Sequence, residues 1–275
     1  MYSINCRGKI YSLSSPLVMG IINATPDSFY EGHLEKTKDE ILMLADKMII
    51  DGADILDIGG QSSRPGSKLI DAAEELLRVI PVIKMIRNAY PDILISVDSF
   101  FSKVAMAAVD AGADIVNDIS AGNIDEDMIP AVARLNVPYI CMHMKGSPQT
   151  MQEHTNYINM LPEILDYFIS KISICRDAGI KDIIIDPGFG FSKTIEQNFI
   201  LLRSLSIFKS LGLPLLTGLS RKSSIYKTLD IDVKDALNGT TVLNTIALQN
   251  GADILRVHDV KEAKQAIRLF TKYQS

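Results

Sequence analysis

The sequence contains no tryptophan and only three cysteines, and it lacks any long uninterrupted apolar run. Cys6, Cys141 and Cys175 are odd in number, widely spaced and outside any CxxC pair, which predicts reduced thiols in a cytoplasmic protein. All apolar runs are far shorter than the ~20 residues that span a bilayer, so we expect no membrane segment. The first residues lack a basic segment followed by an apolar one, and therefore predict no signal peptide.

The chain also lacks a large excess of charge of either sign. The chain has 28 basic and 33 acidic residues, a net charge of −5, which excludes the general positive surface typical of nucleic-acid binding. No Pro/Ser-rich linker or low-complexity run divides the sequence, so we predict one domain over residues 1–275. That length is close to the ~250 residues typical of a single closed α/β barrel.

What is present is a regular alternation of short apolar runs and longer amphipathic segments. Nearly continuous apolar runs are typical of parallel strands that are buried on both faces. The predicted strands are residues 17–23, 53–59, 93–99, 113–119, 138–144, 182–188, 214–220 and 252–258. The predicted helices are residues 35–50, 71–90, 102–111, 125–135, 162–178, 194–211, 233–249 and 261–272.

Glycine marks the junctions from helix to strand. The phrase Gly-Ala-Asp recurs at Gly52, Gly112 and Gly251, and Gly179 opens a looser version. Glycine at these positions predicts a left-handed helix cap that leads directly into a strand. Eight βα units with short connections predict an α/β fold, a single (β/α)8 TIM barrel, with its active site at the carboxyl ends of the strands.

Polar residues fall almost only near those carboxyl ends. Active sites of this fold collect side chains from several strand ends, so these residues are the candidates for chemistry. Asn117 and Asp118 are adjacent, and only one of them can point into the barrel, which spacing alone does not decide. The strand-end residues are Asn23, Asp57, Asp98, Asn117, Asp118, His143, Asp186, Arg256 and His258.

The same strand ends carry a family resemblance. Residues 19–29, 57–66, 96–99, 117–118, 186–191, 220–222 and 256–260 resemble signature segments of the dihydropteroate synthase family, in unbroken order from Met19 to the last helix. Two positions depart from the family pattern. Gln61 stands where the family usually has Glu, and loses a charge. Ser63 stands where it usually has Thr, and keeps the hydroxyl.

The resemblance implies a reaction. A transferase of folate biosynthesis would condense 6-hydroxymethyl-7,8-dihydropterin diphosphate with 4-aminobenzoate, giving 7,8-dihydropteroate and diphosphate. Because a pterin can delocalise positive charge, we expect a dissociative displacement in which diphosphate leaves before the amine attacks. The resemblance also implies Mg2+ as cofactor with Asn23 as its protein ligand, competition by sulfonamides, and a homodimer packed through barrel helices.

The resemblance also assigns residues to each substrate. The pterin is expected at Asp98, Asn117, Asp186 and Lys222. The diphosphate is expected at Ser63, Arg256, His258 and Asn23. The 4-aminobenzoate is expected at Ser63, Phe29, Phe191 and Lys222. Lys222, Arg64 and Asp98 are the expected catalytic residues.

Elementary chemistry agrees with these assignments. Carboxylates and an amide suit the N–H edge of a pterin, and Arg256 with His258, two residues apart on one strand, suits an anion. Asp186 alternatively caps the following helix. The loops around residues 27–29 and 63–65 are predicted to cover the site and exclude water. Asp57 is expected to touch the reacting centre or order a loop, and His143 to line the pocket floor or bond to the backbone.

Other functions stay open on the residues. A methyltetrahydrofolate-dependent methyltransferase-like barrel would share the pterin-binding carboxylates but would need no diphosphate pocket. A non-catalytic pterin-binding paralogue predicts the loss of Lys222, Arg256 or Asp98, all of which are present. A metal hydrolase would use His143, His258, Asp186 and Asp98 as ligands, but the sequence has no HxH pair or His-rich strand end. We expect small-molecule substrates and no nucleic-acid or membrane partner.

Overall fold

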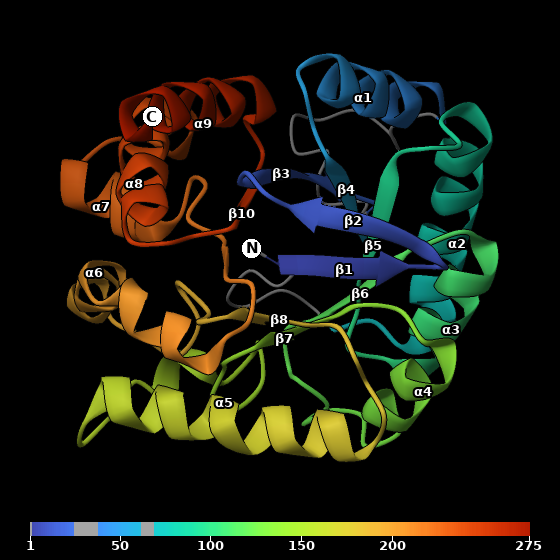
Figure 1. Cartoon of the computed structure of the whole chain (residues 1–275), viewed down its shortest axis with the longest axis horizontal. Coiled ribbons are helices and arrows are strands. Elements are labelled where there is room, and N and C mark those ends of the chain that lie inside the picture. Colours follow the sequence, from blue (N-terminus) through green and yellow to red (C-terminus); the bar gives the residue numbers. More distant parts are fainter. Residues whose placement is uncertain (1, 25–37, 62–68) are drawn as a thin grey trace.

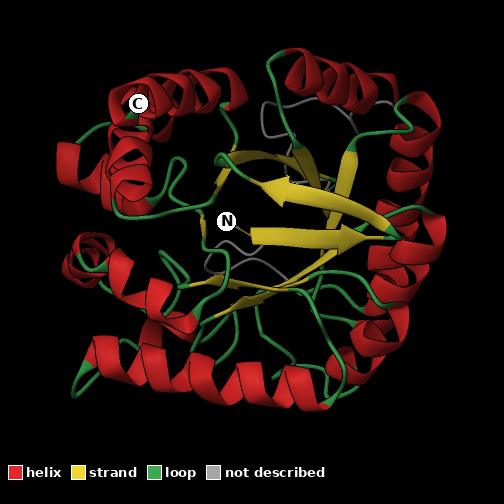
Figure 2. Cartoon of the chain, viewed as in Figure 1, coloured by secondary structure: helices red, strands yellow, loops and turns green. Residues whose placement is uncertain are grey.

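We describe the chain from a computed structural model, which covers residues 2–24, 38–61 and 69–275. Eight parallel strands surround the centre of the molecule, and helices form a ring outside them (Figures 1 and 2). The strands follow the order β8-β7-β6-β5-β4-β3-β10-β9. They are β3 (Leu17–Asn23), β4 (Ile55–Gly59), β5 (Leu94–Asp98), β6 (Ile115–Asp118), β7 (Tyr139–Met142), β8 (Ile183–Asp186), β9 (Leu216–Thr217) and β10 (Ile254–Val257).

The barrel closes between β8 and β9, where the strands share few backbone contacts. β9 is only two residues long, and the space between β8 and β9 is crossed by the bridge Ile185–Leu215 and by the hydrogen bond from Ile185 N to Pro214 O, 3.0 Å long. Every other neighbouring pair is a regular parallel ladder. The predicted (β/α)8 barrel is therefore confirmed.

The helices confirm the predicted alternation, correct two of its boundaries, and include one short helix at Ser223–Leu229 that was not predicted. The predicted segment 194–211 is interrupted at Ser204, where an α-helix gives way to a 3-10 helix, and the segment 233–249 begins as a separate 3-10 turn. The α-helices are α1 (Lys38–Ile50), α2 (Ala72–Ala89), α3 (Ser102–Ala111), α4 (Met128–Leu135), α5 (Met160–Asp177), α6 (Ile195–Arg203), α7 (Ser223–Leu229), α8 (Leu237–Gln249) and α9 (Val260–Gln274); the 3-10 helices are η2 (Met151–Glu153), η3 (Leu205–Leu211) and η4 (Val233–Asp235).

The glycine caps are confirmed by their backbone angles. Gly52, Gly112, Gly179 and Gly251 have φ values of 101°, 121°, 100° and 96°. A residue with a side chain adopts this left-handed region only with strain, so glycine ends the helix there at little cost. Each of the four positions turns the chain directly from a helix into the next strand.

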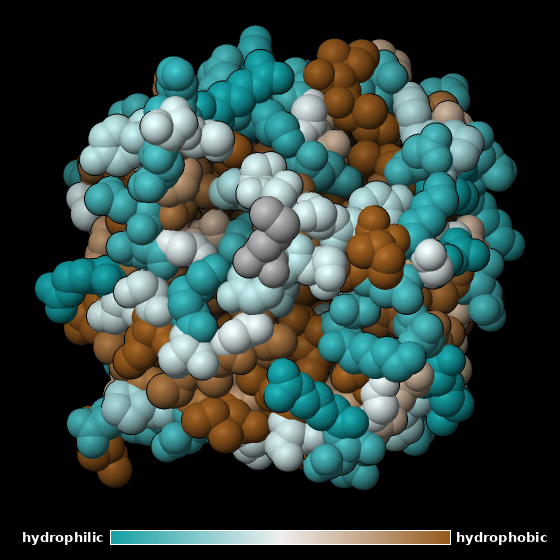
Figure 3. Space-filling view, in the orientation of Figure 1, coloured by the Kyte–Doolittle hydropathy of each residue, from teal (hydrophilic) through white to brown (hydrophobic). Residues whose placement is uncertain are grey.

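An antiparallel hairpin that the sequence analysis did not predict covers the amino-terminal end of the barrel. It consists of β1 (Tyr2–Cys6) and β2 (Lys9–Leu13), and lies across the centre of the view in Figure 1. The inner side of the hairpin packs Ile4, Cys6 and Leu13 against strand residues. Hydrophilic residues predominate around the rim of this face, with separate hydrophobic groups between them (Figure 3).

Beneath the hairpin, each of the eight strands contributes one buried apolar side chain to a continuous layer that we call the floor. This layer closes the barrel at its amino-terminal end, as expected for a barrel whose interior is packed rather than open. Its members are Met19, Ile55, Leu94, Ile115, Ile140, Ile184, Leu216 and Ile254.

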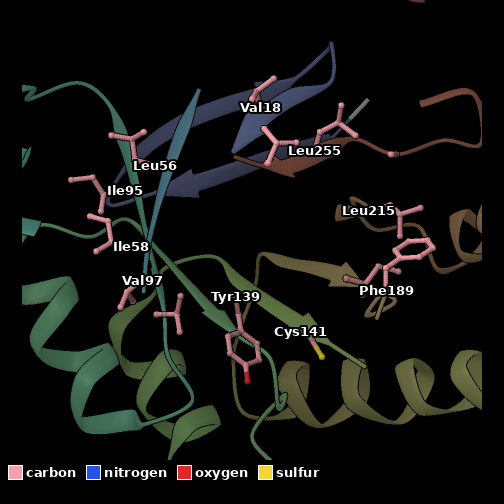
Figure 4. Close-up of a cluster of buried hydrophobic side chains, with 14 of the residues drawn as sticks. Val18, Leu56, Ile58, Ile95, Val97, Tyr139, Cys141, Phe189, Leu215 and Leu255 are labelled. Carbon is pink, nitrogen blue, oxygen red and sulfur yellow. The ribbon is translucent and has the colours of Figure 1, made fainter. Parts of the chain in front are cut away.

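Alternate strand residues point outward and form the larger core. Val18, Leu56, Ile95, Tyr139 and Leu255 belong to this cluster, in which strand side chains pack against the inner faces of the helices (Figure 4). The two-residue period of a strand thus sends one set of side chains to the helices and the other into the barrel.

Two sequence-based expectations concern environment. Cys6, Cys141 and Cys175 are free thiols, as predicted, and all three are buried. Among the residues with described structure, no helix combines the length and the apolar character needed to cross a bilayer.

Candidate functional site

The candidate site lies two residues beyond the floor. Since side chains alternate along a strand, the residues two positions after the floor also point into the barrel. At this level five strands contribute polar side chains instead of apolar ones. These residues are Asp57 of β4, Ser96 of β5, Asn117 of β6, Asp186 of β8 and Arg256 of β10.

Arg256 joins carboxylates from two other strands. Its Nε donates to Oδ2 of Asp57 and its Nη2 donates to Oδ2 of Asp98, both at 2.6 Å. Asp57 is fully buried, and its Oδ1 has no hydrogen-bond partner among the described residues. Two carboxylates raise the pKa of the Arg256 guanidinium despite its burial, so this residue is a permanent cation inside the barrel.

The adjacent pair Asn117 and Asp118 divides between the two sides of β6. Asn117 Nδ2 donates to Oδ2 of Asp57 at 3.1 Å inside the barrel. Asp118 instead accepts hydrogen bonds from Ser120 and Gly122 in the following turn, and from the Tyr139 hydroxyl at 2.7 Å. The alternative that the spacing left open is thus resolved geometrically, with Asn117 facing the site.

Asp98 lies at the upper edge of the same cluster. Burial raises its pKa to about 7; the Arg256 guanidinium opposes the rise, while Asp57 and other carboxylates add to it. The register pairs Asp98 with Gly59 on one side and Asn117 on the other. The site therefore holds several carboxylates around one guanidinium, an arrangement that suits a ligand with several N–H donors.

Lys222 and Phe191 form a second part of the site beside Asp186. The Lys222 ammonium donates to the Phe189 carbonyl and lies 4.8 Å from the centroid of the Phe191 ring, a cation–π distance. Burial lowers the pKa of Lys222 to about 8, with Asp186 opposing. Asp186 Oδ1 accepts from Gly188 N at 2.8 Å, so this carboxylate orders the turn after β8 rather than capping α6, whose cap is Thr194.

The two strand ends after β9 and β10 are tied together. Ser220 Oγ lies 3.0 Å from His258 Nδ1, and Arg221 makes a bidentate ion pair with Asp259, with distances of 2.9 and 2.8 Å. Arg221 also donates to the carbonyls of Val233 and Lys234. The segment that carries Lys222 is thereby fixed to the segment that carries His258, a function of Arg221 that the sequence analysis did not predict.

Asn23 ends β3 opposite Gly59, and its half-buried side chain makes no hydrogen bond to any residue whose placement is described. Phe29, Ser63 and Arg64 lie outside the described residues, as do both predicted covering loops. Gln61 precedes the second of these segments and accepts a 3.0 Å hydrogen bond from Ile70 N. A glutamate would accept the same bond, so the loss of charge at Gln61 leaves this contact intact.

His143 is buried at the end of β7, where its ring packs edge-on against Tyr167. Its Nδ1 lies 3.1 Å from the ammonium of Lys193. Burial lowers the pKa of His143 to about 2, with the nearby Lys193 adding to the effect. The metal-hydrolase alternative gains no support, since the described part of the chain contains no group of three or more His, Cys, Asp or Glu residues able to hold a metal.

Two buried charged residues near the site were not predicted. Lys193 directly precedes Thr194, the N-cap of α6, and Glu75 lies in the first turn of α2; Lys and Glu are ordinarily exposed at such positions. For Glu75 a signal existed, because it stands in phase with Val79, Val82 and Ile86 on the apolar stripe of α2. For Lys193 no pattern in the sequence indicates burial.

Comparison with known proteins agrees with this geometry. A family model described as "Pterin binding enzyme" matches residues 19–258. The dihydropteroate synthase of Synechocystis sp. is 44% identical over 255 residues, which cover 92% of this chain and 88% of the relative.

Solved structures superpose over nearly the whole chain. The dihydropteroate synthase of Yersinia pestis, in complex with a sulfonamide drug, has a TM-score of 0.94 at 37% identity, covering 99% of both chains. That of Xanthomonas albilineans, with 4-aminobenzoic acid, has a TM-score of 0.92 at 38% identity, covering 99% of this chain and 98% of the other. The chain therefore belongs to the dihydropteroate synthase family of pterin-binding enzymes.

Proposed function

We propose that this chain catalyses the dihydropteroate synthase reaction. It joins the methylene carbon of 6-hydroxymethyl-7,8-dihydropterin diphosphate to the amine of 4-aminobenzoate and releases diphosphate. The observation that carries the proposal is the placement of carboxylates, an amide, Arg256 and Lys222 within one barrel mouth, in a chain of the dihydropteroate synthase family.

The pterin belongs in the polar layer above the floor. A pterin edge offers several N–H donors, and the inward carboxylates Asp57, Asp98 and Asp186 supply acceptors from three strands. The Oδ1 atom of Asp57 is buried and has no hydrogen-bond partner among the described residues, so it is available to accept a hydrogen bond from the pterin. Asn117 supplies an amide oxygen in addition to the N–H that it gives to Asp57. Directly below, the apolar floor sets the depth to which the ring enters.

The amine belongs at Phe191 and Lys222. An aromatic ring can stack near Phe191, and the Lys222 ammonium is placed to attract the carboxylate of aminobenzoate or the ring of the pterin. After the C–N bond forms, the anilinium nitrogen is a strong acid and loses its proton without a dedicated base. Ser63 and Phe29, outside the described residues, stay predicted contributors to this pocket.

The diphosphate belongs near Arg256, His258 and Asn23. Arg256 gives Nε and Nη2 to the carboxylates, which leaves Nη1 for an anion. In a dissociative displacement the C–O bond breaks first and its electron pair leaves on diphosphate, after which the amine captures the pterin cation. The oxygen of Asn23 fits one position of a Mg2+ ion that keeps its waters. When bound with the substrate, Mg2+ would neutralise charge on the departing diphosphate.

The chain is further proposed to form a homodimer through its outer helices. Val242 and Ile246 of α8 and Leu269 and Tyr273 of α9 are exposed to solvent, Tyr273 to 78%. Between α8 and α9 lies a groove of about 400 Å³ with a largely apolar lining. An apolar surface of this kind is typical of a protein interface. Light scattering of the chain and of a Leu269→Asp variant tests this assembly, and a monomeric parent chain contradicts it.

The catalytic proposal is tested by measuring diphosphate release from the pterin substrate with and without 4-aminobenzoate. Amine-dependent release with formation of dihydropteroate is expected, and a sulfonamide should compete with the amine. A folded chain that releases no diphosphate in response to the amine refutes the proposal. A single-turnover rate that rises linearly with the nucleophilicity of substituted anilines contradicts only the dissociative order of steps and leaves the proposed overall reaction intact.

A further inference from the structure

Lys193 is a buried cation for which the proposed reaction gives no direct role. Its side chain is 3% exposed and makes no ion pair with any described residue. Its three N–H groups have three neutral acceptors, namely Gly188 O and Phe191 O at 3.0 Å and His143 Nδ1 at 3.1 Å. Burying an ammonium with no carboxylate in direct contact is costly. Burial lowers the pKa of Lys193 to about 7, and the charge of Asp186 opposes this fall only in part. An apolar residue would avoid that cost, so the ammonium has a specific task.

The acceptors of Lys193 identify that task. Gly188 and Phe191 are the ends of one four-residue loop after β8, and the carbonyl between them, that of Phe189, accepts from Lys222. The same loop carries the Phe191 ring, 4.8 Å from the Lys222 ammonium. Two lysines therefore hold this loop through different carbonyls. Lys193 follows the loop in the chain and bonds to it from the buried side, whereas Lys222 comes from the segment after β9 and bonds to it from the site.

Glycine geometry makes this loop dependent on its hydrogen bonds. Gly188 and Gly190 have φ values of 73° and 80°, and a Cβ at Gly188 would lie 2.1 Å from the His143 carbonyl oxygen. Glycines that adopt these angles also permit many others, so the bonds from Lys193, together with the 2.6 Å bond from Gly190 N to Asn198 Oδ1, select the observed shape.

We infer that Lys193 is a positioning residue for the amine substrate: by holding the Gly188–Phe191 loop, it sets the distance between the Phe191 ring and the Lys222 ammonium. The inference rests on the proposed function for its kinetic consequence. Two of the three pterin carboxylates, Asp57 of β4 and Asp98 of β5, do not contact this loop. The third, Asp186, is held by β8 and meets the loop through one hydrogen bond from Gly188 N. Loss of the Lys193 bonds therefore displaces the amine pocket more than the pterin pocket.

The kinetic test compares Lys193→Met, which keeps the length and removes the three donors, with Lys209→Met. Lys209 pairs with Asp253 at the amino-terminal side of the barrel, away from the site, and is the matched control. For Lys193→Met we expect KM for 4-aminobenzoate to rise about tenfold and KM for the pterin diphosphate to change by less than about twofold. Equal changes in both constants, or none, overturn the inference.

Lys193→Gln covers the case in which Lys193→Met does not fold. Its amide can donate to two of the three acceptors, so the same separation of the two KM values is expected with a smaller rise for the amine. If Lys193→Gln folds and both KM values change equally, the role of Lys193 is purely structural and the inference is refuted.

A second readout does not depend on catalysis. The sequence has no tryptophan, so Phe191→Trp introduces a single tryptophan into the loop, whose fluorescence can be excited separately from that of the nine tyrosines. Adding Lys193→Met to this variant is expected to increase quenching by acrylamide, while adding Lys209→Met is not. Unchanged quenching refutes the inference about the loop. If the parent chain shows no amine-dependent diphosphate release, the proposed function fails, and the quenching result still decides what Lys193 does.

Discussion

The Nε atom of Arg256 lies 2.6 Å from Oδ2 of Asp57, although 199 positions separate the two residues in the sequence. Through its Nη2 the same guanidinium also holds Asp98. β10, β4 and β5 are thus joined inside the barrel by one side chain, with β3 lying between the first two. A side chain so placed acts both on the stability of the fold and on the shape of the pterin site.

Arg256→Met should therefore destabilise the chain in a pH-dependent way. Removal of the cation leaves Asp57 and Asp98 buried without their partner, a loss of about 3–5 kcal/mol in free energy of unfolding. Arg256 opposes the raised pKa of Asp98, so in the variant this pKa rises further. The stability deficit relative to the parent is therefore smallest at acid pH, where Asp98 is protonated, and grows as the pH increases. Urea unfolding at pH 5 and pH 8 measures this; a deficit that shrinks with pH contradicts it.

Asp98→Ala should abolish tight pterin binding while the barrel stays folded. The substitution removes an acceptor at the edge of the site and one of the two carboxylates that hold Arg256. Titration calorimetry with the pterin substrate should show an affinity loss of about 100-fold or more, equivalent to about 3 kcal/mol. Ser12→Ala in the hairpin, remote from the site, is the control. Tight pterin binding by folded Asp98→Ala removes Asp98 from the site.

Lys222→Ala should impair the use of both substrates. Its ammonium contacts the Phe189 carbonyl and faces the Phe191 ring, and Asp186 acts on it electrostatically. We expect kcat/KM for each substrate to fall by about 100-fold. Steady-state assays with either substrate varied give both values, with Lys227→Ala on α7 as the control. An unchanged turnover places Lys222 outside the reaction.

Arg221→Ala should lower turnover without contact between Arg221 and either substrate. The bidentate pair with Asp259 fixes the turn on which Lys222 stands, so its loss allows Lys222 to move. A fall in kcat of about tenfold is expected. Arg221→Lys should recover only part of it, because an ammonium cannot make the two parallel bonds. Full activity in Arg221→Lys argues for a simple charge effect instead.

Glu75→Gln should flatten the pH dependence of stability between pH 4.5 and 8. Glu75 is fully buried and accepts from Ser99 Oγ at 2.9 Å, and burial raises its pKa from 4.5 to about 8. Since the folded state holds the proton more tightly, the parent loses up to about 1.4 kcal/mol per pH unit as the pH rises through this window. Gln keeps an acceptor and does not titrate. Thermal unfolding across the range checks this, with the exposed neighbour Glu74→Gln as the control.

The order of strands and helices was predictable because it depends on local patterns. Continuous apolar runs placed all eight barrel strands, and the glycines at 52, 112, 179 and 251 placed four junctions. The hairpin of β1 and β2 was missed, since its strands are short and mixed in polarity. The break at Ser204 was missed because the apolar spacing continues through it.

The site was predictable only as far as strand ends specify it. Register and alternation bring Asp57, Asn117 and Arg256 to one level, which the sequence pattern anticipates. The contacts of Lys193 and Arg221 were not predictable in the same way. Lys193 bonds to the loop directly before it, but its third partner, His143, and the Arg221 partner, Asp259, come from other βα units. The positions of Phe29, Ser63 and Arg64 stay predictions.

The floor has a consequence for how this protein can change over evolutionary time. Eight apolar side chains separate the lower barrel, which the hairpin seals, from the polar layer in which substrates would lie. A mutation in the floor acts first on folding, while a mutation one step higher acts first on recognition. Mutations in the polar layer can therefore change which ligand is bound without first destabilising the barrel. Selection for folding and selection for ligand recognition act on different residues.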